Sequence, residues 1–151
     1  MGEVQVVVFT LEREEYGLEI SKVQEIVHYQ QATKIPEAPD FFQGIINLRG
    51  KVIPVFDLKK RFYQKETQIT ENTRIVVASV GSFTVGIMAD EVSEVLQLPE
   101  ETIETLPTIF ASFAEGGVYA VGKLEDRLLL LLDLEKTINE KELENLEAGL
   151  L

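Results

Sequence analysis

The sequence predicts a mainly β protein, in which two small packed β-barrels are related by internal duplication and carry short helical turns and a C-terminal helix. The first observation is a succession of short runs rich in β-branched and aromatic residues, separated by turn residues. The second is that this succession repeats at fixed sequence offsets. The third is the length of 151 residues, which suits two small barrels of roughly five strands each plus one helix.

The duplication follows from subtracting residue numbers. Gly86 minus Gly17 is 69, and Asp133 minus Asp57 is 76. Further matches at these two offsets are Val6 with Ile75, Leu18 with Ile87, Val23 with Val92 and Glu25 with Glu94 at 69, and Leu48 with Leu124 and Leu58 with Leu134 at 76. An ordered set of this kind favours duplication over chance similarity between strands. We therefore expect residues 1–151 to form one domain with halves at about residues 4–63 and 73–138, between which strands can be exchanged.

The first half begins with a predicted hairpin. Residues 4–10 and 16–20 are rich in β-branched and aromatic side chains, and a polar stretch separates them. Ser21 can then cap a helical turn over residues 22–26, because its hydroxyl can accept a hydrogen bond from an amide at the start of a helix.

A stiff connector leads to a second predicted hairpin. The prolines within residues 35–39 favour extended backbone. Two strand-like runs follow, residues 44–48 and 51–56, joined by Arg49 and Gly50. Glycine can adopt the positive φ that a tight hairpin turn needs, so the two runs are expected to pair.

The next elements join the two halves. Asp57 is expected to cap a short helix over residues 58–63. Residues 64–72 are polar and without pattern, which is typical of an exposed loop. Two strands are then predicted, over residues 74–80 and 83–89, with a Gly-Ser turn between them.

The C-terminal part, residues 134–151, is expected to be a helix and tail. Good helix formers predict one continuous helix over residues 133–148, followed by a glycine that can end it. Its apolar stripe consists of Leu134, Ile138, Leu143 and Leu146. The step of five between the second and third of these residues interrupts the helical period, so the packing of the second half of this helix stays open.

Composition excludes several classes of function. With 26 acidic and 14 basic residues, the net charge of −12 argues against nucleic acid and anionic membranes as partners. The lack of cysteine excludes disulfides, thiolate nucleophiles and cysteine-ligated metal sites. The N-terminus shows no signal peptide and no apolar run long enough to span a bilayer, so a cytoplasmic protein without direct membrane insertion is expected.

Catalytic residues are scarce. His28 is the one histidine of the chain, and the motif of a nucleophilic serine is absent from the sequence. The chain carries no calcium-loop or phosphate-loop motif, so neither a metal nor another cofactor is expected. Two functions remain open at this point. One is a small hydrolase that uses His28 with surface carboxylates, and the other is a double barrel with a small molecule in the groove between its barrels.

Arg49 stands at the predicted tip of the second hairpin, directly after an apolar run. A guanidinium in this place can be merely exposed, can pair locally with one of the many carboxylates, or can face a partner protein. The sequence leaves these three possibilities open.

Four stretches of the chain resemble the CheW family of chemotaxis coupling proteins. The central stretch is GIINLRGKVIPVFDL, residues 44–58, and it is preceded by a similar block at residues 14–26. Residues 85–92 and 127–134 look like the third and fourth blocks of the family. The blocks fall in the family's order between residues 6 and 138, and it is their combination that makes the resemblance specific.

The resemblance implies two five-stranded SH3-like barrels packed side by side, in agreement with the duplication. It also implies a non-enzymatic adaptor that joins the cytoplasmic tips of methyl-accepting chemotaxis receptors to the regulatory domain of the histidine kinase CheA. Such a protein is expected to be cytoplasmic, to be recruited to receptor arrays and to be a monomer when isolated.

The resemblance also implies partner-binding residues. Positions matching Val23 and Glu25 lie in a segment that similar proteins use for partner binding, and those matching Gly44 and Arg49 are tied to receptor or kinase coupling. Further candidates for the groove between the barrels are Ile26, Val27, Val92 and Val95. For the valines and isoleucines, burial in a barrel core is an equal alternative, and the sequence does not decide which partner Val23 or Glu25 meets.

Overall fold

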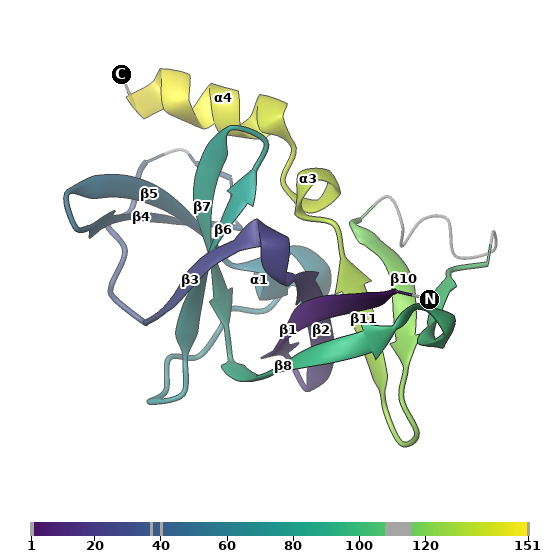
Figure 1. Cartoon of the computed structure of the whole chain (residues 1–151). Coiled ribbons are helices and arrows are strands. Elements are labelled where there is room, and N and C mark those ends of the chain that lie inside the picture. The colour runs from purple at the N-terminus through teal and green to yellow at the C-terminus, as the bar shows by residue number, and fades with distance from the viewer. Residues whose placement is uncertain (1, 37, 40, 108–115, 151) are drawn as a thin grey trace.

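The computed structural model describes residues 2–36, 38–39, 41–107 and 116–150 and shows two antiparallel-rich sheets with short helices (Figure 1). In spatial order, the six-stranded sheet contains β8 (Glu91–Pro99), β1 (Glu3–Leu11), β2 (Glu14–Glu19), β11 (Leu128–Leu132), β10 (Val118–Lys123) and β9 (Ile103–Thr105). The five-stranded sheet contains β3 (Val23–His28), β6 (Arg74–Val80), β7 (Phe83–Ala89), β5 (Lys51–Phe56) and β4 (Phe42–Leu48). The helical elements are η1 (Ile20–Lys22), α1 (Leu58–Tyr63), η2 (Glu100–Thr102), α3 (Leu134–Thr137) and α4 (Glu140–Leu150). The predicted mainly β fold class is confirmed, with the short β9 as a sixth strand in one sheet.

The two sheets have the same strand order. The order β3-β6-β7-β5-β4 of one sheet corresponds to β8-β1-β2-β11-β10 of the other. Each sheet also contains one parallel pair at a matching place, with Val55 opposite Gly86 in one and Leu131 opposite Gly17 in the other. Residues 23–89 supply the whole five-stranded sheet, whereas the six-stranded sheet combines residues 3–19 with residues 91–132.

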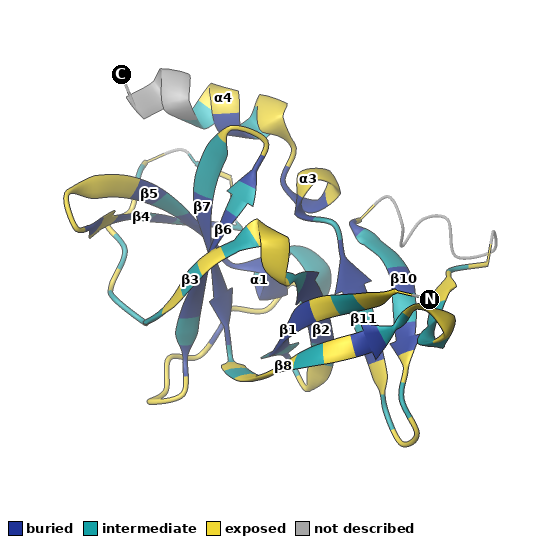
Figure 2. Cartoon of the chain, in the orientation of Figure 1, coloured by how far each residue is buried: buried dark blue, intermediate teal, exposed yellow. Residues whose placement is uncertain are grey.

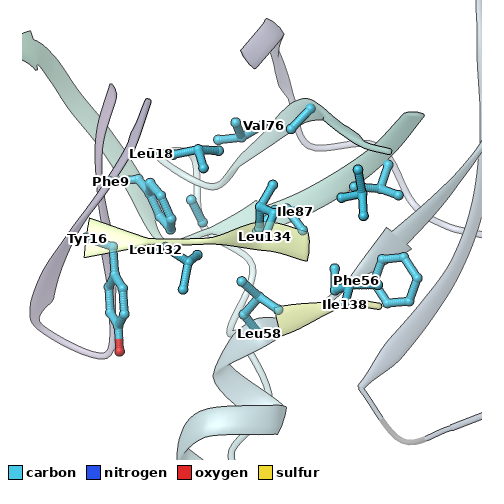
Figure 3. Close-up of a cluster of buried hydrophobic side chains, with 14 of the residues drawn as sticks. Phe9, Tyr16, Leu18, Phe56, Leu58, Val76, Ile87, Leu132, Leu134 and Ile138 are labelled. Carbon is cyan, nitrogen blue, oxygen red and sulfur yellow. The ribbon is translucent and has the colours of Figure 1, made fainter. Parts of the chain in front are cut away.

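Buried residues lie on the strands of both sheets (Figure 2). Within the described part of the chain, they form three apolar cores. One lies within the five-stranded sheet and includes Ile53 and Met88, and a second lies within the six-stranded sheet and includes Val6 and Leu129. The third and largest is shared by both sheets and the helices (Figure 3). Its labelled members are Phe9, Tyr16, Leu18, Phe56, Leu58, Val76, Ile87, Leu132, Leu134 and Ile138. Burial of this apolar surface is what holds the two sheets against each other.

Helix α1 begins after β5 and packs against the six-stranded sheet through aromatic side chains. The ring of Tyr16 on β2 stacks between those of Phe9 and Phe62. The hydroxyls of Tyr16 and Tyr63 are hydrogen-bonded at 2.7 Å. Burial raises the pKa of both tyrosines, so both stay neutral at physiological pH and can share this bond.

The predicted continuous C-terminal helix is wrong: the structure has two helices, α3 and α4. The backbone of Ile138 is extended, and its side chain is fully buried in the shared core. Asn139 then starts α4 by accepting a hydrogen bond from the Glu142 amide, and the Glu142 carboxylate accepts one from the Asn139 amide. This reciprocal cap explains why the apolar stripe steps by five residues at this point.

The predicted helical turn over residues 22–26 is also wrong, because these residues belong mostly to β3. A single 3₁₀ turn, η1, ends at Lys22, and its N-cap has no side-chain hydrogen bond. Val23, Ile26 and Val27 are β-branched, and pairing with β6 places them at the edge of the five-stranded sheet. Tertiary pairing therefore outweighs the local capping signal of Ser21.

The turn between β1 and β2 contains backbone conformations that favour glycine. Leu11 is paired with Glu14, and the two turn residues, Glu12 and Arg13, have φ values of 63° and 115°. We expect Arg13→Gly to raise the free energy of unfolding by about 1 kcal/mol, because glycine adopts positive φ without the steric cost of a Cβ atom. Urea denaturation followed by circular dichroism measures this change. Arg13→Ala is the control, and an equal gain in this variant would attribute the effect to the lost charge.

Candidate partner-binding site

The structure brings together Glu25 and Arg49, two of the residues predicted to bind partners. Glu25 lies on β3, and Arg49 lies in the two-residue turn between β4 and β5. Arg49 and Gly50 both have positive φ, and the Asn47 side chain accepts a hydrogen bond from the Gly50 amide at 2.8 Å. This turn holds the guanidinium beside the Glu25 carboxylate, and the two form an ion pair. The arginine side chain nevertheless stays 68% exposed, so the pair can contact another protein.

The other candidates on β3 and β8 differ in their surroundings. Val23 and Val92 are half-buried and pack against the shared core, and Val27 packs against the core of the five-stranded sheet. In contrast, Ile26 and Val95 are among the exposed large aliphatic residues. Of these candidates, Ile26 and Val95 therefore offer the most apolar surface to a partner. Val23, Val27 and Val92 instead contribute to packing against the cores.

Gly44 is buried and presents no side chain to a partner. Its φ is +142°, and a Cβ atom built on it would lie 2.4 Å from the Thr33 carbonyl oxygen. Thr33 and Ile45 exchange two backbone hydrogen bonds at this point, of 2.8 and 2.9 Å. The glycine thus allows the chain before β4 to lie directly against that strand.

A second ion pair of the same kind, which was not predicted from the sequence, lies on the six-stranded sheet. Glu94 on β8 accepts a hydrogen bond from Arg127 at 2.7 Å, and Arg127 stands in the turn between β10 and β11. The Arg127 Nε also lies 3.3 Å from a Glu15 oxygen. The hydrogen bond to Glu94 raises the pKa of Arg127, with the charge of Glu15 acting in the same direction. Arg127 therefore stays charged throughout the physiological pH range.

The duplication offsets relate the glutamates of the two ion pairs but not their arginines. Glu94 minus Glu25 is 69, and Arg127 lies two residues after Glu125, the counterpart of Arg49 at 76. The same offsets relate the exposed aliphatic residues, because Val95 minus Ile26 is 69 and Leu128 minus Val52 is 76. Each sheet therefore carries a Glu–Arg pair. An exposed aliphatic residue follows each glutamate in sequence, and another lies at the start of the strand that follows the arginine-bearing turn.

The structural surroundings of His28 do not favour catalysis. His28 is exposed at the end of β3, where its backbone is paired with Arg74. Within the described ranges, no group of three or more histidine or acidic side chains could hold a metal ion. None of the helices among these residues is long and apolar enough to cross a membrane.

A cavity of about 410 Å³ lies between α1 and the six-stranded sheet. Tyr16, Phe62 and Leu130 contribute to its lining, which is mainly apolar. A small-molecule site between the two barrels stays a prediction, which a ligand-dependent rise in melting temperature would test.

Comparison with known proteins identifies one family. A model of the CheW-like domain matches residues 5–142. The chain is 42% identical to the chemotaxis protein CheW of Klebsiella aerogenes over 136 residues, which cover 90% of this chain and 82% of that protein. It is 31% identical to the chemotaxis protein CheW of Bacillus subtilis over 137 residues, or 91% of this chain and 88% of the relative.

A crystal structure agrees with this result. The scaffolding protein TtCheW from Thermoanaerobacter tengcongensis superimposes with a TM-score of 0.81 at 36% sequence identity. The match covers 94% of this chain and 91% of that protein. Sequence and fold therefore point to the same family over nearly the whole chain.

Proposed function

Because this chain belongs to the CheW family of non-enzymatic chemotaxis scaffolds, which couple receptors to the kinase CheA, we propose that it binds a chemoreceptor tip and the CheA regulatory domain at the same time through two separate surfaces. The observation that carries this proposal is the repeated arrangement of a Glu–Arg ion pair and exposed aliphatic residues, once on each sheet. Simultaneous binding needs two surfaces, and the duplicated fold supplies them.

The chemistry of each surface suits protein binding. The first surface is centred on the Glu25–Arg49 pair and the second on the Glu94–Arg127 pair. Exposed aliphatic residues of the same sheets are Ile26 and Val52 in the first and Val95 and Leu128 in the second. Exposed aliphatic side chains can act as anchors in an interface, and the charged groups beside them select the partner and its orientation. A helical receptor tip would place its apolar face against such anchors.

The proposed function extends to the cellular location and the oligomeric state of the protein. The chain would act in the cytoplasm at receptor arrays. When isolated it would be a monomer, and it would enter larger assemblies only by binding its partners. Size-exclusion chromatography with light scattering measures the state of the free chain, and a dimer at micromolar concentration would contradict this part of the proposal.

Charge reversal at the first surface tests the role of the ion pair. We expect Glu25→Lys or Arg49→Asp to weaken binding of the kinase regulatory domain or the receptor tip by about tenfold, because either change places a repulsive charge within the interface. The fold should be retained, since the Arg49 side chain is largely exposed and surface ion pairs contribute little stability. Isothermal titration calorimetry with each partner measures the affinity, and circular dichroism measures the fold.

Two further variants make the result specific. Glu94→Lys makes the same change on the six-stranded sheet and should affect a different partner from the one affected by Glu25→Lys. The double variant Glu25→Lys/Arg49→Glu restores an ion pair within the chain but reverses both charges. Recovery of binding in this double variant would mean that the pair acts only within the protein, and unchanged binding of both partners by both single variants would refute the site.

A further inference from the structure

The chain passes directly between the two sheets at two places. The first is η1, which joins β2 of the six-stranded sheet to β3 of the five-stranded sheet. The second is the single residue Asp90, which joins β7 of the five-stranded sheet to β8 of the six-stranded sheet. The two crossings correspond in the duplication, because Asp90 minus 69 gives Ser21, the middle residue of η1.

A nearly buried lysine holds the crossing at Asp90. Lys59 extends from α1, and its side chain is only 9% exposed. Its ammonium lies 2.7 and 2.9 Å from the two Asp90 carboxylate oxygens and 3.6 Å from a Glu12 oxygen. The Asp90 carboxylate also accepts a hydrogen bond from the Glu12 amide, and the Asp90 amide donates to the Thr10 carbonyl oxygen. One lysine thus connects α1 to the crossing and to the β1–β2 turn.

The crossing at η1 has a corresponding ion pair that is exposed and reversed in charge. Lys59 plus 76 gives Glu135, which lies on α3 and contacts Lys22 at the end of η1. This pair is 3.4 Å apart, and its side chains are 47% and 49% exposed. An exposed pair of this length is weak and screened by salt, whereas removing one partner of a nearly buried pair has a large effect. The two crossings therefore differ in how firmly they are held.

We propose that Lys59 is a positioning residue that fixes the angle between the two sheets, and that the Lys22–Glu135 pair is its weak counterpart. Burial of the shared core holds the sheets together, and its free energy is non-directional. The contacts of Lys59 with two carboxylates add directional, charge-assisted contacts at one crossing between the sheets. This inference rests on the proposed function, since a fixed angle matters for presenting the two partner-binding surfaces together.

Residual dipolar couplings of the full chain test the angle without any partner. In the wild-type protein, both sheets should fit one alignment tensor. In Lys59→Met, which keeps most of the aliphatic stem, we expect the two sheets to require different tensors, whereas the control Lys22→Met should behave as the wild type. One common tensor and an unchanged angle in Lys59→Met would overturn the proposal. If Lys59→Met does not fold, Asp90→Asn, which weakens the same contacts and leaves the lysine in place, is measured with the same two outcomes.

Binding measurements test the consequence for the adaptor. In Lys59→Met, affinity for the kinase domain alone or the receptor tip alone should stay within about twofold of the wild type. Binding of a probe in which the kinase domain and the receptor tip are joined by a short linker should weaken by about tenfold, because misplaced surfaces cannot be engaged together. Unchanged binding of this linked probe would overturn the role in assembly. Failure of the wild-type chain to bind either partner would instead refute the proposed function, and the dipolar couplings would still decide the role of Lys59.

Discussion

Replacing Gly44 by alanine is expected to lower the free energy of unfolding by about 3 kcal/mol, because strain and overpacking act at the same position. The backbone of Gly44 has a φ of +142°, which L-residues rarely adopt. The new Cβ atom would also lie 2.4 Å from the Thr33 carbonyl oxygen and 2.8 Å from its carbon. Both are backbone atoms, so no side-chain rotation can relieve the clash. Urea denaturation monitored by circular dichroism measures the loss.

Gly50 provides the matched control, since it also has a positive φ but open space around it. Its φ is +86°, and no atom lies within 4 Å of a Cβ built there. We expect Gly50→Ala to cost only about 1 kcal/mol, the strain of the backbone alone. Equal losses in the two variants would show that the contact with Thr33 does not contribute.

Gly44 is expected to affect partner binding indirectly, through the position of the turn that carries Arg49. A side chain at residue 44 would push β4 away from Thr33 and so shift the turn that carries Arg49. Loss of binding in Gly44→Ala should therefore come with a change in the backbone amide chemical shifts of residues 45–50. Loss of binding with unchanged shifts there would mean that Gly44 itself lies against a partner.

Asp57→Ala is expected to lower the free energy of unfolding by about 3 kcal/mol, through loss of a helix cap and of two further buried hydrogen bonds. The Asp57 carboxylate is 1% exposed and accepts from the Lys59 amide at the start of α1. It also accepts from the Thr67 amide at 2.9 Å and from the Thr67 hydroxyl at 2.7 Å. Alanine would leave these donors without their partner and would free the loop after α1. Chemical denaturation gives the total effect, and hydrogen exchange of the Thr67 amide shows its local part.

The duplication supplies a control within the same chain. Asp133 caps α3 by accepting from the Glu135 amide at 3.0 Å, and among the described residues its carboxylate accepts no hydrogen bond that corresponds to those from Thr67. Asp133→Ala should therefore cost about 1 kcal/mol, the value of a cap alone. A loss as large as that of Asp57→Ala would assign the effect to capping and would contradict the role of Thr67.

Local sequence signals predicted the elements whose pairing partners are close in sequence. The strands over residues 51–56, 74–80 and 83–89 and the helix over residues 58–63 have the bounds that the pattern indicated. Each is bounded by a glycine turn or an aspartate cap, and such signals act within a few residues. In contrast, the local pattern predicts a helical turn over residues 22–26, because the strand partner of β3, β6, lies about fifty residues away and leaves no local trace.

The candidate site shows the same division between local and distant signals. The resemblance implied Glu25 and Arg49 as partner-binding residues, but their ion pair depends on how β3 meets the β4–β5 turn, which no local pattern encodes. The offset of 69 matches Glu94 with Glu25, but the offset of 76 matches Arg49 with Glu125, so the offsets alone do not predict the Glu94–Arg127 pair. The burial of Gly44 depends on Thr33, which lies beyond a connector with two prolines.

The order in which the ribosome releases the strands gives the two sheets different folding histories. All five strands of one sheet lie within residues 23–89, so that sheet can form as soon as this part of the chain has emerged. Strands β1 and β2 are made first, yet most of their sheet lies in residues 91–132. We expect them to wait with apolar faces exposed until the rest of the chain is made, which is slow pairing over a long sequence separation. The N-terminal hairpin is therefore the part of this protein at greatest risk of aggregation during synthesis.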